Sequence, residues 1–223
     1  MLRYLPIALV LTAGPLLAQP GPGLAPALKG RVEDKTYIAP GGTFRLTIPV
    51  LPELGGTISD TANVVTFQDN FNVHVSIAAF PLDATQRWEL STRGLKDYLS
   101  YFFENFVMPD FRNNFPDART ESALYVPDMM NGALLAYTLL PGGSMFSDKR
   151  ALIGADEKPP VAKRGNLVFV RRSTIYIIST ELAERVIERS TYNKTTAEED
   201  EILRLRLADI LKKMEFSRPA TDS

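Results

Sequence analysis

The chain has 223 residues, no cysteine, and 25 basic against 26 acidic residues, which gives a formal net charge of −1. The missing cysteines exclude disulfides, thiolate metal sites and lipid attachment through cysteine. The near-neutral charge gives broad nucleic-acid binding no electrostatic basis. Apolar residues make up 45% of the sequence, enough for an ordinary buried core, so we expect a single domain held together by packing.

The first residues have the pattern of a secretory signal peptide. Arg3 precedes an apolar run, and residues 16–18, LLA, form a small-residue cleavage site. The alternative is an uncut membrane anchor, but a Gly-Pro pair interrupts the run, which falls short of the ~20 apolar residues of a spanning helix. We therefore expect a signal peptide over residues 1–18, a Pro/Gly-rich linker over 19–34, one domain over 35–216 and a flexible tail over 217–223.

Short extended runs open the domain. Residues 35–49, KTYIAPGGTFRLTIP, contain two such runs around a Pro-Gly-Gly turn. From Thr43 to Ile48 apolar and polar residues alternate, which predicts a strand with one solvent-facing side. Two further runs, residues 62–68 and 72–80, flank Asp69 and Asn70 and predict a hairpin.

From Ser91 the apolar period changes to three and four, which predicts a helix that ends at Pro109. Its apolar residues form one mainly aromatic stripe. We expect this stripe to face the core rather than a ligand: Leu95, Tyr98, Leu99, Phe102 and Phe106.

Two strands are predicted next, Arg119–Val126 and Ala133–Leu140. The second is apolar at both parities, which is typical of a strand covered on both faces. The run from Gly165 to Thr180 is too long for one ordinary strand. We therefore divide it near Arg172 and Ser173 into a hairpin, although the Asn-Gly turn signal is missing.

The last element is predicted to be an amphipathic helix. Thr196 and Glu199 match a capping box, and Lys212 and Lys213 suit the negative end of the helix dipole. A shorter helix is expected over residues 181–189. The long helix has a single stripe that we expect to be buried: Leu203, Leu207, Ile210 and Met214.

This order of elements predicts an α/β (α+β) fold, in which a mostly antiparallel sheet is flanked by helices in an α/β/α sandwich. Tyr37, the strand FRLTIP, the hairpin containing IYIIS and the terminal helix together resemble the PsbP-like family and the related Ran-binding Mog-type fold. The resemblance covers residues 35–216. It implies a non-catalytic accessory or binding subunit, for some members on the outer side of photosynthetic membranes. No functional residue of the family aligns with a position in this sequence, and the lipid-modified cysteine of some exported members is missing.

Few residues suit catalysis or metal binding. The one histidine, His74, lies in a predicted strand, and the sequence contains no GxSxG elbow. We expect His74 to be a surface or satisfied sheet residue. No HExxH or DxDxDG motif is present, so we expect no cofactor or metal, with a carboxylate-only calcium site as the alternative. Four carboxylates close in sequence could serve a sugar-active hydrolase, although three of them follow proline in turn-like pairs: Asp110, Asp117, Glu121 and Asp128.

Charge is unevenly placed. Residues 40–130 hold 6 basic and 11 acidic residues (6 − 11 = −5), whereas 141–180 hold 7 basic and 3 acidic ones (7 − 3 = +4). An ordinary solvated surface would explain this, and the alternative is a partner-binding edge. Lys163/Arg164 and Arg171/Arg172 should lie at opposite ends of a strand roughly 20 Å long. Because the Gly142-Gly143 loop can approach a turn, we predict one shared site: Lys149, Arg150, Arg171 and Arg172.

Three functions agree with these patterns. The first is an exported, non-catalytic binding or accessory module of the cell envelope that acts through a protein partner, with at most peripheral membrane association. The others are a carboxylate-dependent hydrolase and a carrier of a small apolar ligand. Carboxylates about 5 to 10 Å apart in a cleft would favour the hydrolase, and a dry pocket between helix and sheet the carrier. After signal cleavage the protein would be periplasmic or extracellular.

Overall fold

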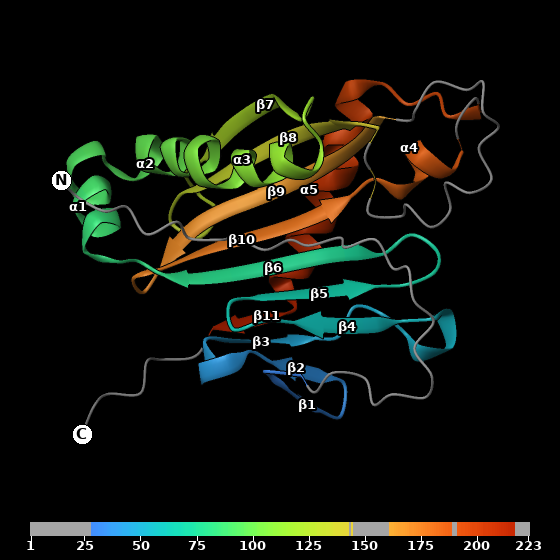
Figure 1. Cartoon of the computed structure of the whole chain (residues 1–223), viewed down its shortest axis with the longest axis horizontal. Coiled ribbons are helices and arrows are strands. Elements are labelled where there is room, and N and C mark those ends of the chain that lie inside the picture. Colours follow the sequence, from blue (N-terminus) through green and yellow to red (C-terminus); the bar gives the residue numbers. More distant parts are fainter. Residues whose placement is uncertain (1–27, 143, 145–160, 189–190, 217–223) are drawn as a thin grey trace.

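The computed structural model describes residues 28–142, 144, 161–188 and 191–216. Its main element is a seven-stranded antiparallel sheet (Figure 1). In spatial order this sheet contains β4 (Thr57–Asp60), β5 (Val64–Gln68), β6 (His74–Pro81), β10 (Thr174–Glu181), β9 (Val161–Arg171), β8 (Ala133–Pro141) and β7 (Arg119–Val126). The predicted strand pairs are all present, and β8 is buried on both faces as its apolar sequence predicts.

A smaller antiparallel sheet has four strands, in the order β1 (Arg31–Glu33), β2 (Thr36–Ile38), β3 (Phe44–Thr47) and β11 (Met214–Phe216). The first of these strands lies within the segment expected to be linker. The last strand comes from the far end of the chain and pairs with β3, placing Phe216 opposite Phe44. The small sheet therefore joins residues separated by most of the sequence.

The helices are α1 (Ala84–Arg93), α2 (Leu95–Phe102), the π-helical turn η3 (Phe103–Val107), α3 (Met108–Asn114), α4 (Ala183–Ile187) and α5 (Thr196–Lys212), with the short 3-10 turns η1 (Pro40–Gly42) and η2 (Pro52–Leu54). None of the helices in the described ranges is long and apolar enough to cross a membrane.

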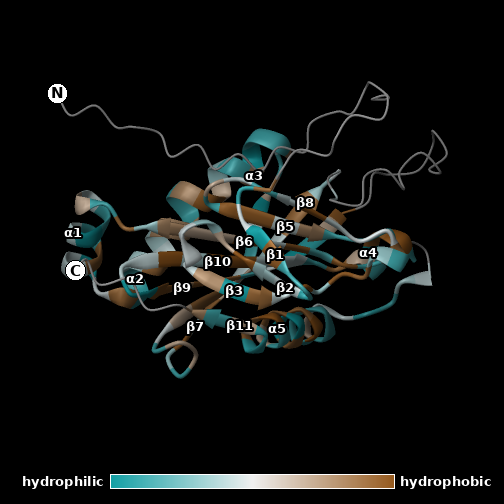
Figure 2. Cartoon of the chain, turned by 90° about the horizontal axis from the view of Figure 1, so that it is seen from below, coloured by the Kyte–Doolittle hydropathy of each residue, from teal (hydrophilic) through white to brown (hydrophobic). Residues whose placement is uncertain are grey.

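Two hydrophobic cores lie on the two faces of the large sheet. One is formed with α2, η3 and α3, and the other with α5 and the small sheet. Figure 2 shows hydrophobic residues along the central strands. Gly165 in β9 lets α5 approach, because a Cβ there would lie 3.0 Å from the Leu203 Cβ. The structure is thus the predicted α+β sandwich.

The helical region differs from its prediction at Pro109. The helix does not end there, because η3 widens the turn and the Met108 N–H donates to the Phe103 carbonyl five residues earlier. Pro109 then occupies the first turn of α3, where a missing N–H is tolerated. The predicted stripe is buried at Tyr98, Leu99 and Phe102, whereas Phe106 is 36% exposed.

The capping box of α5 lies one residue earlier than predicted. Thr195 accepts a hydrogen bond from the Glu198 N–H, and the Glu198 carboxylate accepts one from the Thr195 N–H. Glu199 points into the fold instead and is buried. The predicted stripe is confirmed: Leu203, Leu207, Ile210 and Met214 are all buried.

Candidate functional site

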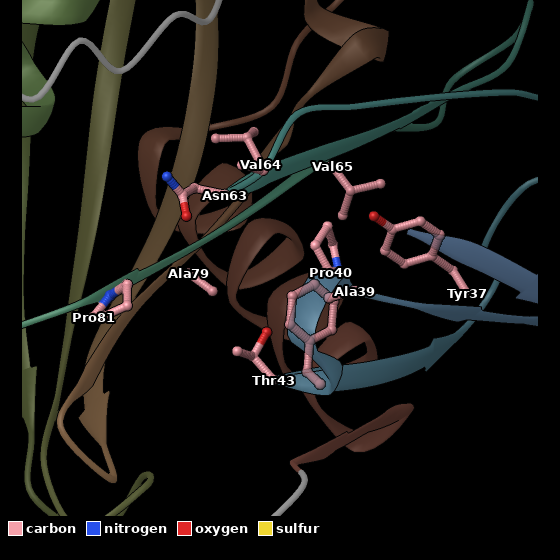
Figure 3. A pocket seen from close by; sticks show the side chains of 11 residues that line it. Tyr37, Ala39, Pro40, Thr43, Asn63, Val64, Val65, Ala79 and Pro81 are labelled. Carbon is pink, nitrogen blue, oxygen red and sulfur yellow. The ribbon is translucent and has the colours of Figure 1, made fainter. Parts of the chain in front are cut away.

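A pocket of about 150 Å³ opens between the two sheets (Figure 3). It lies where the β4–β5 turn, the end of β6 and the η1 turn meet. Most of its lining is apolar, with small side chains at several positions. The lining residues are Tyr37, Ala39, Pro40, Thr43, Phe44, Ala62, Asn63, Val64, Val65, Ala79 and Pro81.

Local hydrogen bonds fix the two turns that form the walls of the pocket. In the β4–β5 turn, the Thr61 hydroxyl accepts hydrogen bonds from the N–H groups of Asn63 and Val64, at 3.3 and 3.1 Å. In the η1 turn, the Ala39 N–H donates to the Phe44 carbonyl at 3.0 Å. Gly41 there has φ +68°, a conformation that favours glycine. The pocket is therefore pre-formed by its own backbone.

Tyr37 contributes a neutral phenol to the pocket. Its hydroxyl donates to Asp60 at 2.7 Å, and Asp60 also accepts the N–H groups of Lys29 and Gly30 at 2.8 and 2.7 Å. Burial, together with the hydrogen bond to Asp60 and its charge, raises the pKa of Tyr37 well above its ordinary value. The pocket is thus suited to apolar contacts rather than acid–base chemistry.

The β9–β10 turn, with Arg171 and Arg172, borders this pocket. Thr174 lies opposite Pro81, a lining residue, and the Leu82 N–H donates to the Ser173 carbonyl at 2.8 Å. An Arg172 Nη1–H donates to the Phe216 carbonyl at 3.3 Å. The Arg171 guanidinium lies 5.0 Å from the centre of the Phe216 ring. Two of the four predicted binding residues therefore lie on a turn next to the lining residue Pro81, although neither of them lines the pocket.

Lys149 and Arg150 fall outside the described residues. The segment that carries them follows Pro141, which pairs with Val161 at the end of β9 remote from the Arg171–Arg172 turn. Whether all four residues share one site stays a prediction.

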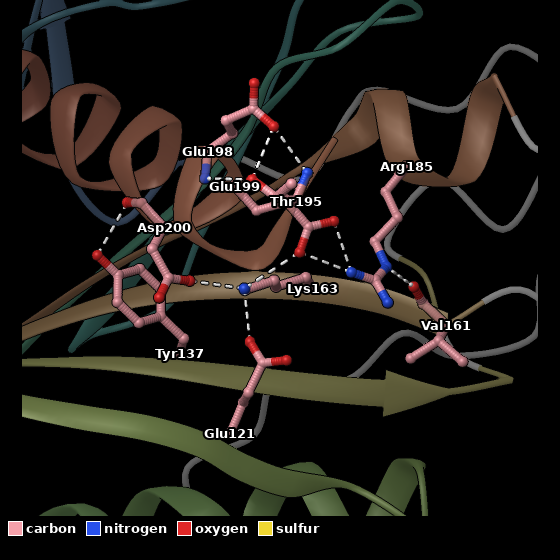
Figure 4. Close-up of polar contacts among 9 residues, drawn as sticks. All are labelled: Glu121, Tyr137, Val161, Lys163, Arg185, Thr195, Glu198, Glu199 and Asp200. Carbon is pink, nitrogen blue, oxygen red and sulfur yellow. Dashed lines mark hydrogen bonds and ion pairs between the residues drawn. The ribbon is translucent and has the colours of Figure 1, made fainter. Parts of the chain in front are cut away.

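Lys163 lies at that remote end of β9, and its side chain is fully buried beneath α5 (Figure 4). Its Nζ forms ion pairs with Glu121 at 2.5 Å, Asp200 at 2.6 Å and Glu199 at 3.1 Å. Glu199 is also held by Arg185, at 2.6 and 2.7 Å. A β-bulge between Thr120 and Ser122 breaks the alternation of β7 and lets Glu121 turn toward α5.

The charge of Lys163 is stabilised by its partners. Burial alone would lower the pKa of the ammonium, but the hydrogen bonds that it donates to Asp200, Glu121 and Glu199 outweigh burial and raise that pKa. A permanently protonated lysine cannot act as a nucleophile or general base. The Lys163 cluster, meaning Lys163 with Glu121, Glu199, Asp200 and Arg185, therefore ties β7, β9, α4 and α5 together.

A second buried group lies on the opposite face of the sheet. Arg164 is fully buried, with Nη2 3.5 Å from His74 Nδ1 and its guanidinium 5.5 Å from the centre of the Phe111 ring. Burial, and then the positive charge of Arg164, lower the pKa of His74 well below its ordinary value. His74 is thus a neutral residue inside the sheet and lies outside the pocket lining.

The carboxylates considered for hydrolysis do not converge on the pocket. Glu121 belongs to the Lys163 cluster, Asp117 and Asp128 are exposed, and Asp110 lies in α3. None of the four lines the pocket. Within the described ranges, no group of three or more His, Cys, Asp or Glu residues is arranged to hold a metal ion.

Sequence reasoning missed the pocket and the partners of Lys163. A lysine inside an apolar strand indicates a buried ion pair, but nothing in the sequence assigns Glu121, Glu199 and Asp200 to it. The pocket depends on two sheets meeting, which no local pattern records.

No family model matches the chain, and no curated protein sequence does either. Solved structures of similar shape include cyanobacterial PsbP (CyanoP) from Synechocystis sp. PCC 6803, with 13% identity, a TM-score of 0.48, and coverage of 92% of this chain and 100% of that one. The Saccharomyces cerevisiae Ran-binding protein Mog1p has 9% identity, a TM-score of 0.48, and coverage of 85% and 96%. A Bacteroides thetaiotaomicron protein has 14% identity, a TM-score of 0.40, and coverage of 85% and 50%. Structures of a PsbP and of Mog1p are therefore among these matches, and at these identities and TM-scores no residue role is carried over.

Proposed function

We propose that the protein is an exported, non-catalytic binding or accessory module of the cell envelope that acts through a protein partner. The observation that carries this proposal is the apolar pocket between the sheets, with two arginines beside it. The signal-type pattern of the first 18 residues supports export. An apolar cavity with a charged margin suits the docking of a side chain from another protein.

The size of the pocket favours a side chain over a small-molecule cargo. Ligand pockets usually enclose about 300 to 1,000 Å³, whereas this one holds about 150 Å³. An apolar cavity of about 150 Å³ accommodates a molecule such as benzene, which is one aromatic ring. The pocket also lies between two sheets, not between helix and sheet as a carrier was expected to require.

The placement of the titratable groups argues against the hydrolase. Lys163 is held protonated by its carboxylates, and His74 is buried and neutral on the other face of the sheet. Tyr37 remains a neutral phenol. A site for acid–base catalysis needs groups that can exchange a proton within hydrogen-bond reach of a bound substrate, and the one titratable side chain in the pocket lining is the neutral Tyr37.

The test is crosslinking in intact cells, followed by immunoprecipitation of the chain. Ala62 is exposed on the pocket wall, so Ala62→Phe would fill the pocket without disturbing the core. We expect it to abolish a crosslink that the wild type forms. Ala84→Phe, at an exposed position in α1, is the matched control and should keep the crosslink. Equal crosslinking by both variants, or no crosslinked protein with the wild type, would contradict the proposed function.

A further inference from the structure

We infer that the pocket and Arg171 together recognise an extended protein segment with an apolar side chain and, two residues away, a carboxylate. This inference rests on the proposed function and adds the chemistry of the partner. Its occupant is a segment of another protein, because the site combines a cavity for one side chain with a nearby cation.

The pairing of the strands places Arg171 on the same side of the sheet as the pocket. Arg171, Thr174 and Pro81 lie opposite one another in β9, β10 and β6. Directly opposed residues of antiparallel strands share a face. Ala79, two residues before Pro81, lines the pocket, and the Arg171 guanidinium packs on Phe216 in the same core layer.

The spacing of the strands gives the separation of the two binding elements. Neighbouring strands lie about 4.8 Å apart, so the Cα atoms of Arg171 and Pro81 are about 10 Å apart. An extended segment advances about 3.3 Å per residue and directs alternate side chains to one side. A carboxylate two residues from the pocket-filling side chain would face the sheet about 7 Å along, within reach of the long arginine side chain.

The electrostatics of Arg171 favour a carboxylate. Among the described residues no carboxylate forms an ion pair with Arg171, and its buried Nε has no hydrogen-bond acceptor. The nearby Glu215 is paired with Arg45 at 2.6 Å. The Arg171 guanidinium lies 5.0 Å from the centre of the Phe216 ring, and its planar fork suits bidentate carboxylate binding. Among the residues that the structure describes, the site thus has a positive charge without a paired carboxylate near an apolar cavity.

The probe is a pair of synthetic peptides of identical composition. In acetyl-Gly-Asp-Thr-Leu-Thr-Asp-Gly-amide the carboxylates lie two residues from leucine on both sides, so the direction of the bound chain does not matter. In acetyl-Gly-Thr-Asp-Leu-Asp-Thr-Gly-amide they are adjacent to leucine and face the other way. Both are titrated to millimolar concentration into the full chain, and binding is followed by amide chemical shifts of Thr43, Asn63 and Ser173.

We expect the first peptide to bind about fivefold more tightly than the second, as for a favourable exposed ion pair. Arg171→Gln should remove this preference, and Arg171→Lys should retain part of it. Arg119→Gln, at an exposed arginine on β7, is the control and should leave the preference unchanged. Ala62→Phe should weaken both peptides.

Other outcomes overturn the inference in distinguishable ways. Equal binding of the two peptides, or none, refutes the ligand class and leaves the crosslinking result untouched. If Ala62→Phe only dissociates a dimer in sedimentation experiments, the occupant is a second copy of the chain and the inference is wrong. If the peptides discriminate as expected but no protein is crosslinked in cells, the proposed function fails instead.

Discussion

At the scale of single residues, two buried cations lie on opposite faces of one strand, β9. Lys163 is surrounded by three carboxylates, and Arg164 lies beside His74 on the other face of the same strand. Adjacent residues of a strand point to opposite faces. Lys163 therefore contacts α5 on one face of the sheet, and Arg164 contacts α3 on the other. Removing either side chain should therefore affect stability before it affects binding.

Substituting Lys163 should be strongly destabilising. Lys163→Met leaves Glu121, Glu199 and Asp200 close together without their shared cation, and removing one partner of a buried ion pair costs about 3 kcal/mol or more. Lys213→Met, which breaks an exposed pair with Asp209, should cost less than about 1 kcal/mol. Urea unfolding measures the free energy of unfolding of both variants. A comparable decrease in the two would show that the Lys163 cluster does not stabilise the fold more than an exposed ion pair does.

His74 should make the fold less stable as the pH falls. The unfolded histidine binds a proton near its ordinary pKa of 6.5, whereas the folded one, with its lowered pKa, does not. The unfolded state thus gains protons first, and the free energy of unfolding decreases by about 1 kcal/mol between pH 6.5 and 5.5. His74→Gln should flatten this dependence, measured by urea unfolding at several pH values, while partner crosslinking persists. An unchanged slope in His74→Gln would refute the assignment.

At the scale of elements, the β9–β10 turn was predicted from the length of the apolar run alone. The hairpin was placed correctly at Arg172 and Ser173 from strand length, without an Asn-Gly signal. Both residues have positive φ, +50° and +56°, as a two-residue type I′ turn requires. The sequence thus accepts a strained conformation at the turn that carries the proposed arginine.

Relieving that strain should stabilise the protein. Glycine adopts positive φ without a steric penalty, so Ser173→Gly should raise the free energy of unfolding by about 1 kcal/mol. Its backbone carbonyl, which accepts the Leu82 N–H, is retained. Ala123→Gly, in the regular part of β7, should be destabilising and serves as the control. A thermal melt distinguishes the two, and a loss of stability in Ser173→Gly would contradict the argument.

At the scale of the whole molecule, local patterns predicted the elements but not how they meet. Alternation identified β3, because it reports the one face that this strand buries, and an apolar run at both parities identified β8, which is buried on both faces. The prediction that the helix ends at Pro109 was wrong. The preceding π turn places Pro109 in the first turn of α3, where its missing N–H is tolerated. The sequence predicts Glu199 as a capping residue, whereas Glu198 has that role. Glu199 instead pairs with Lys163 and Arg185, which belong to other elements and cannot be identified as its partners from the local sequence.

The candidate site was predictable only in part. Arg171 and Arg172 stood out from the sequence as a basic pair at a turn. The pocket beside them requires the small sheet to pack against β5 and β6, and that packing depends on distant contacts such as Tyr37 with Phe67 and Tyr176 with Thr43. The local periodicity of apolar residues does not predict contacts between residues so far apart in the sequence.

The pairing of β11 with β3 determines when the small sheet can be completed during folding. Glu215 lies opposite Arg45, 170 residues earlier, so the small sheet lacks its β11 edge until nearly the whole polypeptide is available. Loops of this length close slowly and late in folding. If the chain is exported N-terminus first, as proposed, this edge would be completed only after the last strand has emerged on the far side, and the proposed partner site beside Phe216 would form there.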